Sequence, residues 1–99
     1  MTYRLEIDED ALKEWRRLDG SVRTQFEKKL AKVLENPRIP ASALAGMKDC
    51  YKIKLRKAGM RLVYRVEDAI VTVIVIAVGK RDKSAVYETV LARLKSSGL

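Results

Sequence analysis

The sequence has no histidine and only one cysteine, Cys50, among its 99 residues. A single thiol excludes an intramolecular disulfide. The side chain that enzymes most often use as acid or base near neutral pH is absent altogether. The first twenty residues mix charged with apolar side chains and do not have the pattern of a secretory signal. These features lead us to expect a cytoplasmic protein.

Long apolar segments are also lacking. The most apolar run, Ala69 to Val78, has ten residues, about half of the roughly 20 that a membrane-spanning helix needs. We therefore expect no membrane partner. A chain of 99 residues can bury one modest core, so we expect residues 1–99 to form a single domain.

Positive charge is in excess, with 21 Lys and Arg against 13 Asp and Glu and a net charge of +8. Residues 1–49 hold ten basic and nine acidic side chains, whereas residues 50–99 hold eleven and four. A one-sided positive field attracts polyanions. The second half of the chain is therefore expected to meet nucleic acid or an acidic protein.

The spacing of apolar residues predicts an α+β fold: a small four-stranded, largely antiparallel sheet with two N-terminal helices on one face and a C-terminal helix. The expected strands are residues 3–7, 51–55, 60–66 and 70–78. The expected helices are residues 9–18, 22–36 and 83–95. Asp8 and Ser21 are the expected N-caps of the first two helices. The run at 70–78 is apolar enough for a strand buried on both faces.

The hairpin at 51–66 carries a cluster of positive charge. Its apolar residues all lie on one face only if Leu55 is opposite Met60, Ile53 opposite Leu62 and Tyr51 opposite Tyr64. That register puts Lys54 opposite Arg61, with Lys52 and Arg65 on the same face. Like charges facing each other destabilise a sheet, so the cluster requires an explanation. One explanation is a solvated face of long basic side chains, and another is a site.

The segment GKRDKSAVY, residues 79–87, favours a site. It follows the most apolar strand and opens the last helix, so Arg81 and Tyr87 are expected next to the basic hairpin. Helix N-termini favour phosphate.

The chain resembles the RelE family of ribosome-dependent mRNA endonuclease toxins in three segments: YRLEIDEDALKEWRRL, LAGMKDCYKIKLRKAGMRLVYRV and VIAVGKRDKSAVY. The resemblance extends from about Tyr3 to Leu94. It implies the compact α+β fold that RelE shares with the gyrase-poisoning ParE toxins, and cleavage of translated mRNA without a cofactor. The partners that it implies are a cognate RelB-like antitoxin, the ribosome, mRNA and, through the antitoxin complex, operator DNA.

Residue by residue, the resemblance also implies a site. The positions that match catalytic residues of RelE-type toxins are Lys52, Lys54, Arg61, Arg81 and Tyr87. One position departs from the family pattern, because Ala45 stands where a basic residue can precede the loop glycine. Further basic residues are assigned only to RNA or ribosome contact: Arg56, Arg65, Lys80 and Lys83.

When the 2'-hydroxyl of an RNA attacks the neighbouring phosphate, the reaction needs a base for that hydroxyl, an acid for the leaving 5'-oxygen and hydrogen-bond donors around the phosphorane. Crowding several cations lowers the pKa of a lysine or a tyrosine, so Lys52, Lys54 and Tyr87 are three alternatives for the base. Arg61 and Arg81 suit the phosphate through their forked donors. The resemblance places Arg81 near the leaving oxygen, either as proton donor or as charge stabiliser.

We expect no metal site, because one cysteine and scattered carboxylates do not form a ligand set. Two other functions remain open. One is a ParE-like gyrase inhibitor, since one fold can carry several functions. The other is a non-catalytic RNA- or DNA-binding module, for which positive charge alone would suffice.

Overall fold

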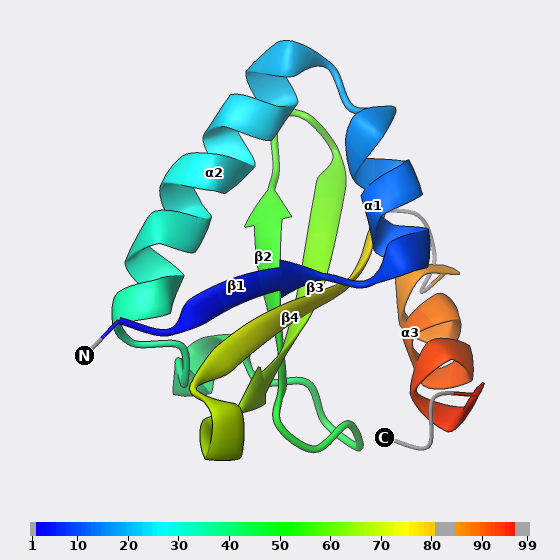
Figure 1. The fold of residues 1–99 in the computed structure, drawn as a ribbon. Coiled ribbons are helices and arrows are strands. Elements are labelled where there is room, and N and C mark those ends of the chain that lie inside the picture. Colours follow the sequence, from blue (N-terminus) through cyan, green and yellow to red (C-terminus); the bar gives the residue numbers. More distant parts are fainter. Residues whose placement is uncertain (1, 81–84, 97–99) are drawn as a thin grey trace.

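The computed structural model describes residues 2–80 and 85–96, which form a four-stranded sheet with helices on both faces (Figure 1). In chain order the elements are β1 (Arg4–Ile7), α1 (Glu9–Arg16), α2 (Gly20–Glu35), the short helix η1 (Pro40–Ser42), β2 (Cys50–Leu55), β3 (Met60–Glu67), the short helix η2 (Asp68–Ile70), β4 (Thr72–Lys80) and α3 (Ala85–Ser96). The sheet order is β1-β4-β3-β2. The predicted α+β fold is confirmed.

The sheet is mostly antiparallel, as expected. Strands β2, β3 and β4 form an antiparallel meander, whereas β1 runs parallel to β4 and pairs with Thr72–Val75. A parallel neighbour requires a long crossover connection, and this one contains α1, α2 and the hairpin. Strand β1 is short, so it covers only the first part of β4.

The main core lies between the sheet and the first two helices. Helix α2 contributes Phe26, Leu30 and Val33, which are buried at helical spacing, and α1 contributes the buried Ala11. Trp15 and Phe26 pack together with ring centroids 6.3 Å apart. The two N-terminal helices therefore cover one face, as the sequence predicts.

Helix α3 covers the opposite face of the sheet, and Figure 1 shows it across the sheet from α2. Its Val86 and Val90 pack on Val63, Ile76 and Ala77 in a second, smaller core. A β-bulge assists this packing, since Val63 pairs with Ala77 while Tyr64 pairs with Val75. The extra residue lets Ile76 and Ala77 both join the second core, which explains why β4 is apolar almost throughout.

The predicted helix caps have different outcomes. Asp8 is confirmed as the cap of α1, because its carboxylate accepts a hydrogen bond from the Asp10 amide at 3.2 Å. Ser21 is wrong as the cap of α2: the cap is Asp19, and Gly20 is already helical. The Asp19 carbonyl accepts the first helical hydrogen bond, from the Arg23 amide at 3.0 Å. The helix therefore begins two residues earlier than the serine suggests.

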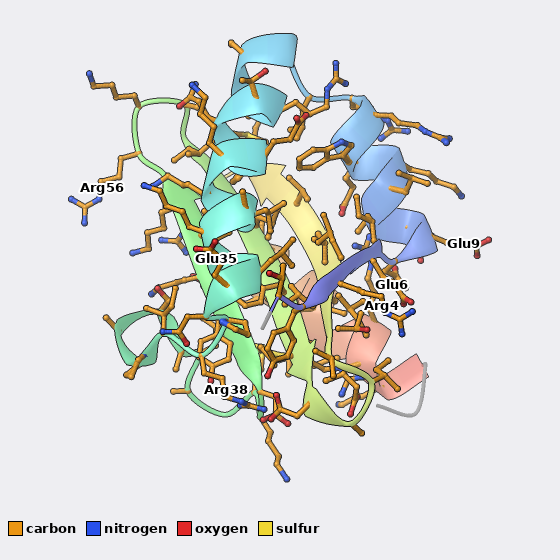
Figure 2. The ribbon with its side chains drawn as sticks, turned by 60° about the vertical axis from the view of Figure 1, so that its left-hand side comes forward. Arg4, Glu6, Glu9, Glu35, Arg38 and Arg56 are labelled. Atoms are coloured by element: carbon orange, nitrogen blue, oxygen red, sulfur yellow. The ribbon has the colours of Figure 1, made fainter. Side chains whose placement is uncertain are left out.

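The hairpin register is confirmed at every predicted pair. Leu55 pairs with Met60, Ile53 with Leu62, Tyr51 with Tyr64 and Lys54 with Arg61. The turn between the strands closes with a hydrogen bond from the Gly59 amide to the Arg56 carbonyl at 3.2 Å. Gly59 adopts a φ of 65°, which glycine tolerates best. Arg56 projects from this turn into solvent (Figure 2).

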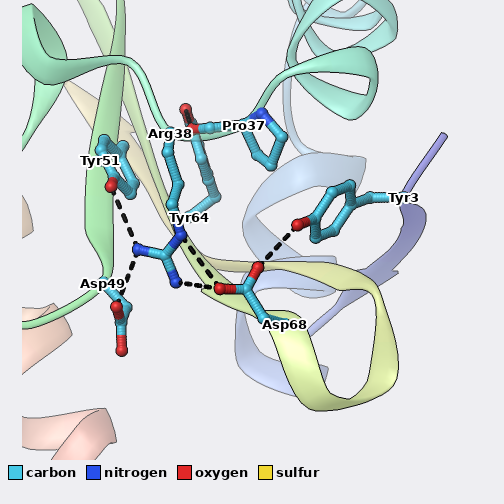
Figure 3. A network of polar contacts seen from close by, with 7 residues as sticks. All are labelled: Tyr3, Pro37, Arg38, Asp49, Tyr51, Tyr64 and Asp68. Atoms are coloured by element: carbon cyan, nitrogen blue, oxygen red, sulfur yellow. Dashed lines mark hydrogen bonds and ion pairs between the residues drawn. The ribbon is translucent and has the colours of Figure 1, made fainter. Parts of the chain in front are cut away.

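A polar network secures the long connection between α2 and β2 (Figure 3). The Arg38 guanidinium binds Asp49 at 2.9 Å and Asp68 at 2.8 Å, and Tyr3 donates to Asp68 at 2.6 Å. Hydrogen bonds from Tyr3 and Arg38 lower the pKa of Asp68. The network joins the residue before β1, the connection and η2 at the end of the sheet away from the hairpin turn.

Beneath this network, Tyr64 is fully buried and donates to the Pro37 carbonyl at 2.8 Å. Burial raises the pKa of its phenol. Within residues 2–80 and 85–96, no helix has both the length and the apolar character that crossing a membrane requires.

Candidate nucleic-acid cleavage site

Arg61 and Tyr87 meet on the sheet face that α3 covers. Arg61 lies on β3, and Tyr87 lies in the first turn of α3. Arg61 Nη1 donates a hydrogen bond to the Tyr87 oxygen at 2.8 Å, and its guanidinium carbon lies 5.2 Å from the centre of the Tyr87 ring. The guanidinium therefore contacts both the hydroxyl and the ring. Residues 26 positions apart are joined in one half-buried pair.

The guanidinium of Arg61 retains donor capacity. Its Nε is buried and has no hydrogen-bond partner among the described residues. Arginine has five N–H donors in a rigid fork that matches a phosphate. The cation is thus held by Tyr87 without being neutralised by a carboxylate in the described part of the chain.

A small residue on β4 allows α3 to approach this pair. Gly79 lies opposite Arg61 in the sheet. A Cβ atom at Gly79 would come within 3.1 Å of Val86 Cγ2, which is closer than carbon atoms normally approach. The missing side chain therefore lets the first turn of α3 pack directly on β4, which places Tyr87 over β3.

Lys52 and Lys54 lie on the edge strand β2. Lys54 pairs directly with Arg61 across the hairpin, and both lysines are half-buried. They line a hollow of about 270 Å³ between β2 and α2, together with Lys29 and Lys32. The basic surface therefore continues from the Arg61 region around the open edge of the sheet to α2.

The residues assigned to RNA or ribosome contact lie at different places. Arg56 and Lys80 are exposed, at the hairpin turn and at the end of β4. The Arg65 side chain is only 13% exposed and binds Glu67 at 2.6 Å. Arg81 and Lys83 lie outside the described residues. The structure thus joins Arg61 with Tyr87 and sets Lys54 beside them, and it leaves the position of Arg81 open.

The sequence patterns do not reveal two features of this region. Lys29 and Lys32 face outward from α2 and have no sequence feature that marks them as part of a site, and only the tertiary structure sets them beside β2. Glu14 and Arg93 were not singled out, yet they form an ion pair of 2.9 Å between α1 and α3. A signal existed, because each lies within the apolar stripe of its helix.

No group of three or more Cys, Asp or Glu side chains that could hold a metal ion occurs within residues 2–80 and 85–96. The described site offers positively charged groups and a phenol. A guanidinium, two ammonium groups and a phenol suit a phosphodiester, whose charge rises as it is attacked.

Comparisons with known proteins identify related toxins. A family model described as "ParE toxin of type II toxin-antitoxin system, parDE" matches residues 5–85. The chain is 58% identical over 94 residues to the mRNA interferase toxin RelE of Escherichia coli, covering 95% of this chain and 99% of that protein.

Two solved structures of the E. coli toxin are similar to most of this chain. A free mutant form has a TM-score of 0.89 at 57% identity, covering 95% of this chain and 99% of that one. The toxin in the intact RelBE toxin-antitoxin complex has a TM-score of 0.79 at 60% identity, covering 82% and 99%. The fold and the sequence therefore indicate the same group of proteins.

Proposed function

The chain belongs to the RelE family of mRNA interferase toxins of type II toxin–antitoxin systems, and from this premise we propose that it cleaves translated mRNA on the ribosome without a metal ion. The proposed catalytic residues are Lys52, Lys54, Arg61, Arg81 and Tyr87. The proposed contacts to RNA or ribosome are Arg56, Arg65, Lys80 and Lys83. The toxin acts in the cytoplasm, where its target is translated.

The observation that carries the proposal is the contact between Arg61 and Tyr87. A chain without histidine needs other groups to move protons and stabilise charge during phosphodiester cleavage. Here a phenol and a guanidinium from different elements meet at 2.8 Å. The guanidinium orients the phenol and keeps further N–H donors for a phosphate oxygen.

The proposed reaction is an internal transfer at phosphorus. The ribose 2'-oxygen forms a bond to phosphorus as its proton passes to a base, for which Lys52, Lys54 and Tyr87 are the candidates. The bond between phosphorus and the 5'-oxygen breaks, and that oxygen receives a proton. Arg61 binds the phosphate oxygens, and Arg81 either gives the proton or stabilises the leaving oxygen. The products are a 2',3'-cyclic phosphate and a 5'-hydroxyl.

The ribosome supplies positioning that this site lacks. The hollow beside Lys52 and Lys54 is open, so free RNA would be held loosely. Proper orientation of the reacting groups can contribute about 7–11 kcal/mol. Binding of mRNA in a fixed conformation on the ribosome would therefore account for ribosome-dependent cleavage.

The proposed regulator is a RelB-like antitoxin. Complexes of related toxins with RelB antitoxins have been solved. An acidic or mixed-charge antitoxin would complement the basic half of this chain, and the antitoxin complex would bring the toxin to operator DNA.

Primer extension on a translated mRNA tests the proposal. Purified toxin should produce cuts only when ribosomes are present, with 2',3'-cyclic phosphate and 5'-hydroxyl ends. Arg61→Lys should cleave slowly because it keeps the charge and loses the fork, whereas Arg16→Ala, an exposed change on α1, should cleave normally. Products with 3'-hydroxyl ends would refute the self-attack mechanism. Gyrase-linked DNA breaks without mRNA cuts would instead indicate a ParE-like inhibitor, and neither activity would indicate a binding module.

A further inference from the structure

Two side chains form hydrogen bonds with backbone groups at the unpaired edge of β4. Strand β1 pairs with β4 only as far as Val75, and the backbone beyond it has no neighbouring strand on that side among the described residues. The Val78 amide donates instead to Glu14 Oε1 at 3.1 Å, and the Ile76 carbonyl accepts from Arg93 Nη1 at 2.7 Å. Glu14 and Arg93 thus occupy the place of a longer β1 and satisfy two backbone groups at the edge.

The same two side chains bind each other. Arg93 Nη1 lies 2.9 Å from Glu14 Oε1, and Nη2 lies 3.3 Å from Oε2. Burial lowers the pKa of Arg93, but the hydrogen bond and charge of Glu14 outweigh it and leave the pKa raised. A two-pronged contact of this kind fixes direction as well as distance. The pair therefore links α1, β4 and α3 at one point.

Arg93, one member of this pair, lies on α3, the helix that carries Tyr87. Tyr87 and Arg93 are six residues apart on α3, roughly 9 Å along its axis. Val86, just before Tyr87, and Val90, between Tyr87 and Arg93, pack on the sheet, and apolar contacts are non-directional. They hold a helix against a surface but leave its rotation and sliding weakly determined. Directed polar contacts on both sides of this apolar row, Arg61 to Tyr87 and Glu14 to Arg93, remove that freedom.

We propose that Glu14 and Arg93 are positioning residues that fix the rotation and axial position of α3 and thereby hold the Tyr87 phenol against Arg61. Neither side chain needs to touch RNA. Their effect on cleavage rests on the proposed function, whereas their effect on the position of Tyr87 does not.

Two variants separate the pair in different ways. Arg93→Ala removes the donors to Glu14 and to the Ile76 carbonyl. Glu14→Gln keeps the shape and an oxygen for the Val78 amide but removes the charge. Matched controls are Lys95→Ala on α3 and Glu9→Gln on α1, both exposed.

The first readout is the position of Tyr87. Carbon-13 labelling of the tyrosine ζ-carbons gives separate NMR signals, and the Tyr87 signal is identified by its loss in Tyr87→Phe. In Arg93→Ala and Glu14→Gln the Tyr87 signal should shift or broaden. The signals of Tyr51 and Tyr64, which pack on the other face, should stay as in the wild type, as should all signals in the controls.

The second readout is single-turnover cleavage of ribosome-bound mRNA. The maximal rate should fall at least ~10-fold in Arg93→Ala, because a misplacement of about 1 Å can cost roughly 100-fold. The concentration of toxin at half-maximal rate should not change. Arg93→Lys, which keeps the charge, should recover part of the rate. Combining Glu14→Gln with Arg93→Ala should cost no more than Arg93→Ala alone, since the two act as one unit.

An unshifted Tyr87 signal in a folded Arg93→Ala protein would overturn the proposal. A shifted signal with a wild-type rate would refute the effect of Glu14 and Arg93 on cleavage. If Arg93→Ala does not fold, the same two readouts on Glu14→Gln decide. A wild-type protein that fails to cleave mRNA on ribosomes would refute the proposed function. The NMR readout would still decide whether Glu14 and Arg93 position Tyr87.

Discussion

Replacing Tyr87 with phenylalanine removes one atom, the oxygen that accepts a hydrogen bond from Arg61 Nη1 at 2.8 Å. A hydrogen bond to a charged group contributes about 1.5–3 kcal/mol. The lower end applies here, because the pair is half-buried and water can replace part of the contact. The phenyl ring keeps its packing in the second core. We therefore expect a loss of about 1.5 kcal/mol in the free energy of unfolding.

That loss of stability is small compared with the expected loss of activity. For a domain of this size, 1 kcal/mol corresponds to about 4–8 °C, so Tyr87→Phe should remain folded at 25 °C. If the phenol takes part in proton transfer, its removal should slow cleavage by about 100-fold or more. The assay is single-turnover cleavage of mRNA on purified ribosomes, with toxin in excess and with thermal unfolding followed by circular dichroism.

Tyr3→Phe is the matched control for this measurement. It also removes a phenol oxygen bound to a charged group, since Tyr3 donates to Asp68 at 2.6 Å, but it does so at the opposite end of the sheet. It should lower stability without changing the cleavage rate. A Tyr87→Phe protein that cleaves within threefold of the wild-type rate would refute a catalytic role for Tyr87. An equal slowing by Tyr3→Phe would show that lost stability explains both.

Three further predictions concern the body of the fold. Burial raises the pKa of Tyr64, so the neutral phenol stabilises the fold fully below pH about 10, and the free energy of unfolding should fall above that pH by about 1.4 kcal/mol per pH unit. Urea unfolding of Tyr64→Phe should show a shallower decline of stability at alkaline pH. An unchanged decline would contradict this. Gly79→Ala brings a Cβ within 3.1 Å of Val86 Cγ2. A double-mutant cycle with Val86→Ala should therefore give a coupling of about 0.5–1 kcal/mol in the free energy of unfolding. Strictly additive effects would show that the added Cβ and the Val86 side chain are not in contact. Hydrogen bonds from Tyr3 and Arg38 lower the pKa of Asp68, so its carboxylate stabilises the fold above its ordinary pKa of about 4, and this effect is lost as pH falls through the lowered value. The melting temperature of the wild type should exceed that of Asp68→Asn at neutral pH, and the difference should disappear in acid. A difference that stays constant with pH would exclude that linkage.

The hairpin shows how far periodicity can be used. Alternation of apolar residues specifies which pairs face each other, because a slip of one residue would move the whole apolar set to the wrong face. The pairing of Lys54 with Arg61 follows from that constraint and is confirmed. Helix caps are less certain, because several polar residues compete for one position. Asp19 and Gly20 precede Ser21, and the helix begins with them.

The candidate site could be predicted from sequence only in part. The sequence predicts basic residues on the hairpin and a tyrosine in the last helix, but the contact between Arg61 and Tyr87 depends on where α3 packs. The roles of Lys29 and Glu14 depend on neighbours far away in the chain. A lysine facing outward from α2 looks solvated until β2 lies beside it. The catalytic roles assigned by resemblance, including that of Arg81, remain predictions.

By itself, the sequence determined the order of helices and strands, the register of the hairpin and the family to which the chain belongs. These properties depend on local periodicity and on the identity of residues along the chain. Only the tertiary structure decided that α3 lies across the sheet from α1 and α2, that Tyr87 meets Arg61, and that Glu14 and Arg93 close the open edge of β4. Such contacts join residues distant in sequence, and their geometry is set by how the two faces of the sheet are packed.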